Sequence, residues 1–349
     1  MGTRHAIALS GLLVGVLGAA SAATAQDFRL EEVTAARTAN VADIKPGAVE
    51  FSDDTRAGGI DAETALTRFD DWEQKHPDEK KFLALFPSYV EPTVGKATAS
   101  GTKQVVEKLY MYVAQARFVL DKAPAAIDLS RYATLPFLQK IDPAIAHKPI
   151  AAADVTSFAD EAGTGNDNPD RKWCTSRMPS ICIESTYKLE GKIPMGIMLV
   201  NKLRDRVKKV DDHIDFQSEL SALQGADLDQ AGLRQLTSLD TPIAGALEQN
   251  IFYVNEIMKF GKFFAVFQAH PADANRTVVT AFMALAIKAG VLDEKRNFEK
   301  VPVLRNLVPA QVLMGQSSFN SGESISAGLP KYARNEIRTV AGLLARDSN

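Results

Sequence analysis

Three long apolar runs in the second half of the chain constrain its fold most; they span residues 251–258, 263–270 and 278–287. They are rich in Phe, Tyr, Val and Ile, residues that are typical of strands. Pro271, Asp273 and Asn275 separate the second run from the third, and turn residues in this position indicate a hairpin. The third run also contains Ala, Met and Leu and closes at Gly290, so a buried helix suits it as well. We favour the strand and predict an antiparallel sheet.

Apolar residues recur at steps of three and four in most of the other ordered segments, which predicts helices. The predicted helices span residues 61–75, 77–86, 102–122, 194–210, 230–236 and 335–347. The helix over 102–122 has only a narrow polar stripe, so we expect neighbours to bury it on several sides. Alternation over 181–189 predicts one further strand. The expected fold class is α+β: a helical N-terminal half packed on a C-terminal antiparallel sheet wrapped by helices, with one disulfide.

The N-terminus has the pattern of a secretory signal peptide. Arg4 gives a positive start, residues 6–20 are apolar without charge, and residues 23–25 offer the small side chains of a cleavage site. The apolar run is shorter than the about 20 residues of a membrane-spanning helix. We therefore expect an exported protein, periplasmic or extracellular, without a transmembrane segment after cleavage. The expected division is a signal peptide over 1–25, a flexible lead-in over 26–60, a helical region over 61–150 and an α+β region with the sheet over 171–349.

The chain has two cysteines, Cys174 and Cys182, eight positions apart. In an exported protein such a pair most simply forms one structural disulfide. A metal site would need further ligands, and the histidines of the sequence do not supply them at a ligand-like spacing. We therefore predict a disulfide, no metal and no cofactor.

The charge is mild and mixed, with a formal net charge of −3. There is no basic excess that would follow a phosphate backbone, so nucleic acid is not an expected partner. The hydrophobic fraction of 46% is that of an ordinary globular protein. The sequence gives no indication of the oligomeric state.

Two pairs of residues are the candidates for catalysis. Ser100 and Lys103 satisfy the S-x-x-K pattern of penicillin-recognising enzymes, but no S-D-N or K-T-G follows. His213 and Asp215 stand at alternate positions, so on a strand they would share a face and suit a divalent cation. The alternative for this second pair is a solvated acidic end that balances neighbouring cations. The catalytic residues are therefore left unknown.

Apolar residues on both faces of the predicted strands indicate a ligand site. A sheet that helices cover on one side needs only one apolar face, and a second one requires another lid, a partner or a ligand. We predict that Phe252, Tyr253, Phe264 and Phe282 line this site. The alternative is a plain packed core.

The segment GKIPMGIMLVNKL, residues 191–203, resembles the closing strand and helix of START-type lipid-transfer domains. Pro194 and Asn201 are farther apart than in that pattern, and a large segment follows where that fold would end. The resemblance implies a cavity between a helix and a sheet.

Together these observations favour an exported, non-catalytic protein that binds an apolar or amphipathic, lipid-like small molecule between the sheet and its helices. One alternative is an envelope scaffold whose helical first half docks a partner. The other is an exported hydrolase that uses Ser100 and Lys103 or His213 and Asp215.

Overall fold

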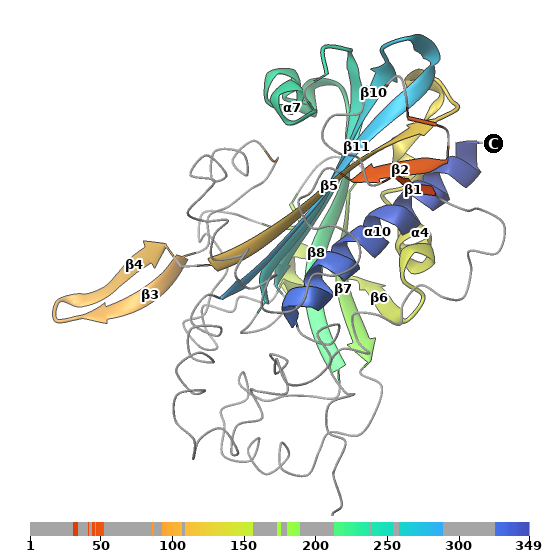
Figure 1. Ribbon diagram of the computed structural model, residues 1–349. Coiled ribbons are helices and arrows are strands. Elements are labelled where there is room, and N and C mark those ends of the chain that lie inside the picture. Colours follow the sequence, from red (N-terminus) through yellow and green to blue (C-terminus); the bar gives the residue numbers. More distant parts are fainter. Residues whose placement is uncertain are drawn as a thin grey trace, which may run out of the picture.

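The computed structural model describes residues 31–33, 41, 44–45, 47–51, 86, 93–106, 109–155, 173–175, 180–188, 213–237, 239–253, 258–288 and 325–348. Within this part of the chain, nine strands form one sheet (Figure 1). In their order across the sheet they are β1 (Glu31–Val33), β2 (Ala48–Phe51), β5 (Leu109–Leu120), β11 (Asp273–Lys288), β10 (Met258–His270), β9 (Ile243–Tyr253), β8 (His213–Leu223), β7 (Ser180–Lys188) and β6 (Ile145–Pro149). Every neighbouring pair is antiparallel except β1 and β2, which are parallel. The predicted antiparallel sheet is confirmed.

The sheet is built around a meander of five consecutive strands, β7 to β11. Of the first apolar run, residues 251–253 end β9 and Met258 begins β10, while residues 254–257 lie outside the described part of the chain. The second and third runs lie in β10 and β11, so the ambiguous third run is a strand, and the predicted strand over 181–189 is β7. The turn after His270 joins β10 to β11, where the amide of Asn275 donates to Oδ1 of Asp273 at 2.9 Å. The predicted hairpin is therefore confirmed.

The long helix predicted over 102–122 is wrong. These residues form β4 (Gly101–Val106) and β5, and β5 pairs with β2 on one side and with β11 on the other. Ala116 and Phe118 are buried on one face of β5 and Val119 is buried on the other. A strand buried on both faces is apolar almost throughout, and such a run has the composition of a buried helix.

The expectations for residues 26–60 and 61–150 also differ from the structure. Strands β1 and β2 lie within 26–60, the expected flexible lead-in, and Val49 and Phe51 of β2 belong to the main core. Within 61–150, the expected helical region, the described residues hold β4, β5, β6, a further strand β3 (Thr93–Thr98) and the α-helix α4 (Leu135–Ile141). The predicted helices over 61–75 and 194–210 lie outside the described residues, as does the segment 191–203.

The two strands that flank the meander, β5 and β6, are consecutive neighbours along the chain but lie on opposite sides of it. The connection between them runs across the sheet through two short 3-10 helices, η2 (Pro124–Ala126) and η3 (Leu129–Arg131), and then through α4. Asp128 caps η3 by accepting the amide of Ser130 at 3.1 Å. Gly245 of β9 permits the close approach, because a Cβ there would lie 2.4 Å from Cδ1 of Leu129. The connection thereby brings α4 over one face of the sheet.

The C-terminal helix α10 (Ile325–Ser348) lies along the same face as α4 (Figure 1). Its predicted apolar stripe is confirmed, since Ile337, Val340 and Leu344 are buried in the main core cluster. Arg334 and Arg338 stack over the ring of Phe51, at 4.7 and 5.1 Å from its centroid. We call this side of the sheet the α10 face.

The opposite side carries the predicted short helix, α7 (Gln230–Thr237), and we call it the α7 face. Asp229 caps α7 by accepting the amide of Gly232 at 3.0 Å. Leu233 and Leu236 of α7 pack in a second core cluster with Phe264 and Phe282. Apolar side chains of α10 pack on one face of the sheet, and those of α7 pack on the other.

Strands β3 and β4 form a separate two-stranded hairpin that projects away from the main sheet (Figure 1). Its turn passes through Gly101, whose φ of 129° suits glycine, and Oγ1 of Thr98 donates to the Gly101 carbonyl at 2.7 Å. Among the described residues, no helix is long and apolar enough to cross a membrane.

Candidate functional site

A partly open cavity lies between the α10 face of the sheet, α4 and α10. Most of its lining is apolar, and four titratable side chains reach it from three different elements or their ends. The lining residues are Phe137, Leu138, Ile141, Asp142, Ile145, His147, Phe216, Leu220, Leu247, Gln249, Ile251, Phe263, Met283, Tyr332, Glu336 and Val340. An apolar cavity with a few converging polar groups is the usual form of a small-molecule site.

Two carboxyl groups in the cavity lining, those of Asp142 and Glu336, interact electrostatically. Asp142 follows the last residue of α4, is 5% exposed, and accepts the amide of Ala144 at 3.0 Å. Burial raises the pKa of Asp142, and the Ala144 hydrogen bond opposes the increase. Burial raises the pKa of Glu336 to about 8, and the negative charge of Asp142 adds to the increase. Asp142 therefore ionises first, and at neutral pH most of the Glu336 side chains are protonated.

Glu336 is partly buried, and it lines the cavity. Among the residues that the structure describes, its carboxyl group has no hydrogen-bond or ion-pair partner. Tyr332 stands one helical turn before it on α10, and burial raises the pKa of this phenol well above its usual value. The phenol is therefore neutral at physiological pH and is able to donate or accept a hydrogen bond.

His147 of β6 lines the cavity from the sheet edge. Its Nδ1 lies 2.8 Å from Oγ of Ser185, on the neighbouring strand β7. Burial lowers the pKa of His147, so the imidazole is neutral at pH 7. Its Nε2 is buried and has no hydrogen-bond partner in the described part of the chain. An orphaned buried nitrogen costs about 1–3 kcal/mol, which is the kind of deficit that a ligand group offsets.

The cavity is small. Its volume is about 40 Å³, against about 10–15 Å³ for one water molecule on the same measure. It therefore has room for a compact group of a few non-hydrogen atoms and not for a long acyl chain. Because it is partly open, a longer ligand can place its polar end inside and leave the rest at the mouth.

The four residues predicted to line a ligand site have different positions. Phe264 and Phe282 are 0% exposed and pack against Phe86 on the α7 face, with ring centroids at 5.9 and 5.3 Å from that ring. Phe252 stacks on Trp173, with centroids 4.6 Å apart. The side chain of Tyr253 lies outside the described part of the structure. None of the four lines the cavity on the α10 face, so their contact with a ligand stays a prediction.

The sequence predictions missed the polar side of the cavity. Tyr332, Glu336 and Val340 are spaced four residues apart on α10, which places a carboxyl group inside an apolar stripe. A carboxyl group at this position of an apolar stripe could have indicated from the sequence that Glu336 belongs to a site. Asp142 and His147 carried no such signal, because both come from a short, polar segment whose place on the sheet depends on the β5 to β6 crossing.

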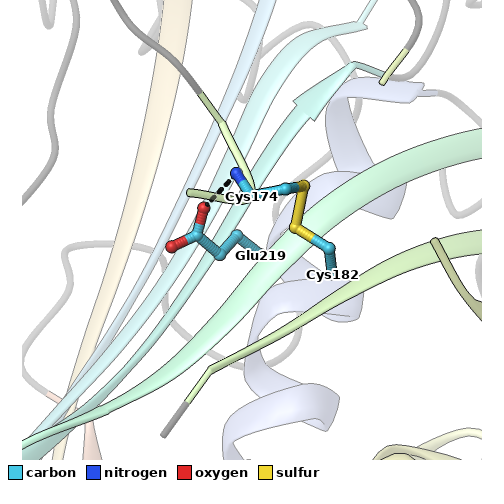
Figure 2. A group of neighbouring side chains, drawn as sticks. All are labelled: Cys174, Cys182 and Glu219. Atoms are coloured by element: carbon cyan, nitrogen blue, oxygen red, sulfur yellow. Dashed lines mark hydrogen bonds between the residues drawn. A yellow bond between two sulfur atoms is a disulfide. The ribbon is translucent and has the colours of Figure 1, made fainter. Parts of the chain in front are cut away.

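The predicted disulfide between Cys174 and Cys182 is confirmed, with 5.5 Å between the two Cα atoms (Figure 2). The amide of Cys174 donates to Oε2 of Glu219 at 2.8 Å, and Glu219 pairs with Cys182 across β7 and β8 (Figure 2). The bond thus fastens the segment that contains Trp173 onto the α7 face. Because the two sulfurs are bonded to each other, Cys174, Cys182 and Glu219 do not form a thiolate metal site.

The predicted catalytic pairs lie away from the cavity. His213 and Asp215 are on β8 as expected, with Nε2 3.2 Å from Oδ2, and Thr186 donates to the other Asp215 oxygen at 2.6 Å. Their side chains are 38% and 48% exposed, and both carboxylate oxygens of Asp215 have a partner in this arrangement. Ser100 and Lys103 are exposed near the turn of the β3–β4 hairpin. Neither pair lines the cavity, so both stay candidates for catalysis.

Comparisons with known proteins give little further guidance. No protein-family model matches the sequence, and no curated protein matches it. Among solved structures, the aromatase/cyclase ZhuI from Streptomyces sp. R1128 is similar at a TM-score of 0.28 and 13% identity, over 68% of this chain and 96% of that one. The lipid transfer and protein localization domain of human StarD13 (DLC2) is similar at a TM-score of 0.26 and 10% identity, over 77% of this chain and 95% of that one. Neither TM-score is high enough to support an inference about what this chain binds.

Proposed function

We propose that this is an exported, non-catalytic protein that binds a small amphipathic molecule in the cavity between the sheet, α4 and α10. The observation that carries the proposal is the convergence of Asp142, His147, Tyr332 and Glu336 on a cavity whose other lining is almost wholly apolar. Buried polar groups without partners are destabilising, so a protein retains them where something binds to them.

The dimensions of the cavity define how such a ligand lies. About 40 Å³ accommodates a polar head and little more, so the head occupies the closed part beside Asp142 and Glu336. The apolar part of the ligand then contacts Ile251, Phe263 and Met283 on the sheet. Burial of each methylene group on these side chains contributes about 0.8 kcal/mol to binding.

Binding is favoured over covalent catalysis by the composition of the lining. Among the described residues that line the cavity there is no Ser, Thr, Cys or Lys. Aliphatic hydroxyl, thiol and amine nucleophiles are therefore missing from the described lining, and we assign its carboxyl, imidazole and phenol groups to recognition. Export is supported by the disulfide, since such bonds persist in oxidising compartments.

Native mass spectrometry tests the proposal. Full-length protein, exported under its own N-terminal segment and purified without detergent, is expected to carry a bound small molecule that organic extraction removes. An Ile251→Phe variant, which fills part of the cavity, should carry less of it. Ile181→Phe is the matched control, because Ile181 is a partly buried isoleucine of the same face that does not line the cavity. A wild-type mass that equals the bare chain, with equal behaviour of the two variants, would refute the proposal.

A further inference from the structure

Within the part of the chain that the structure describes, the cavity lining has carboxyl groups and no cation. Its lining includes two carboxyl groups, Asp142 and Glu336, and neither Lys nor Arg. The two arginines of α10 nearest to Glu336 in sequence, Arg334 and Arg338, are stacked over Phe51. A carboxylate in an apolar cavity is stabilised by an opposite charge, and no residue of the described lining provides one.

We propose that the site selects ligands whose polar end is a cationic amine, and that the Asp142–Glu336 pair binds this ammonium group. This inference rests on the proposed function and names the chemical class of its ligand. An ammonium group supplies the missing positive charge, a neutral ligand leaves the carboxyl groups uncompensated, and an anionic head is repelled. The expected order of affinity for ligands of equal size is amine, then alcohol, then carboxylate.

The hydrogen-bonding groups of the cavity match the same ligand. An ammonium group has three N–H donors and no acceptor. Asp142 and Glu336 supply carboxylate acceptors, and Asp142 uses only Oδ1 for the Ala144 amide. His147 adds an acceptor at Nε2 when its Nδ1 proton is directed at Ser185. Once Glu336 is ionised, a carboxylate ligand finds fewer suitable partners, because the described lining then offers more acceptors than donors.

The affinity for an amine should depend on pH, which a purely structural role of Glu336 would not cause. The groups that face Glu336 are Asp142 from α4, His147 from β6 and Tyr332 from α10, while the sheet contributes apolar side chains such as Phe263 and Met283. His147 and Tyr332 are neutral at pH 7. Below about pH 8 an entering ammonium group must displace the proton of Glu336. Amine affinity is therefore expected to rise between pH 6.5 and 8 and then to level off.

The experiment compares n-butylamine, n-butanol and n-butyrate, which share one apolar chain and differ in the head group. Each is titrated into the full-length protein at several pH values, and the dissociation constant is measured by NMR. The amine should bind at least about tenfold more tightly than the alcohol at pH 8, since a hydrogen bond to a charged group contributes about 1.5–3 kcal/mol. Glu336→Gln should remove this advantage over the alcohol and abolish the pH dependence of amine binding.

Two further variants separate binding from folding. Asp142→Asn should weaken the amine in the same way, whereas Asp347→Asn, which alters an exposed carboxyl group on the same helix, should change nothing. Equal affinities for the amine and the alcohol would overturn the inference and leave the proposed function standing. An amine affinity that is unchanged in a folded Glu336→Gln variant would overturn it as well. If no probe binds and native mass spectrometry also finds the bare chain, the proposed function and the inference both fail.

Discussion

Lys262 of β10 and Glu248 of β9 form an ion pair within the α7 face, where Nζ lies 2.9 Å from Oε1 and each side chain is 3% exposed. The two residues are diagonal neighbours in the register of β9 and β10. The contact is close enough for an ion pair, although Oε1 does not meet the geometry of a directed hydrogen bond. Both side chains are almost fully removed from water, so the ion pair offsets part of the cost of burying the two charges.

Removing one partner of this pair should therefore be strongly destabilising. Glu248→Leu and Lys262→Met are each expected to lower the free energy of unfolding by about 3–5 kcal/mol. The double variant Glu248→Leu/Lys262→Met should lose much less than the sum, because it leaves no unpaired charge. Urea denaturation of the four proteins measures this. Additive losses would show that the two charges are stabilised independently.

The disulfide should stabilise the chain by a moderate amount. Replacing Cys174 and Cys182 by Ser is expected to lower the free energy of unfolding by about 2–3 kcal/mol, since the bond closes a short loop. Thermal unfolding of the oxidised and the Ser-substituted proteins gives the difference. The mass of the untreated exported protein should show no alkylatable thiol, and two free thiols would contradict the assignment.

Stability should fall as the pH rises through the neutral range. The folded-state pKa of Glu336 is about 8, above its usual 4.5, so folding favours the protonated form and the native state binds the extra proton. This contribution is complete below about pH 4.5 and is lost as the pH rises through about 8. Its size is on the order of a few kcal/mol. The raised pKa of Asp142 acts in the same direction.

Urea denaturation between pH 6.5 and pH 9 isolates this effect, because the lowered pKa of His147 acts below pH 6.5 and with the opposite sign. Wild-type protein should lose stability over this interval, and Glu336→Gln should lose less. A wild-type curve that is flat, or that rises, would place the Glu336 carboxyl group in a more solvated setting than its position in the cavity implies.

Two adjacent phenylalanines distinguish the two faces of the sheet. Phe263 lines the cavity on the α10 face, and Phe264 is packed against Phe86 on the α7 face. Replacement of either by Leu should cost about 1–2 kcal/mol, less than the about 3–5 kcal/mol of a Phe→Ala change. Only Phe263→Leu should alter ligand binding, measured as the bound mass in native mass spectrometry. A loss of ligand in Phe264→Leu alone would move the site to the α7 face, where Phe264 and Phe282, two of the residues predicted to line it, are packed.

The sequence alone determined the parts of this protein that rest on local chemistry. The pairing of Cys174 with Cys182 followed from two cysteines at short spacing, and the β10–β11 hairpin followed from turn residues between two apolar runs. The helices α7 and α10 followed from apolar residues at helical spacing. In each case the signal lies within a few residues of the structure that it specifies.

Tertiary structure alone decided the rest, because a buried apolar run has the same composition in a strand and in a helix. Residues 109–120 are a strand since β2 and β11 pair with them on either side, and both partners are remote in the sequence. The same holds for the site. Glu336 and Asp142 are almost two hundred positions apart, and they share a cavity only because the chain crosses the sheet between β5 and β6 and α10 then packs on the same face. Their pKa values are set by that shared burial, which no local pattern contains.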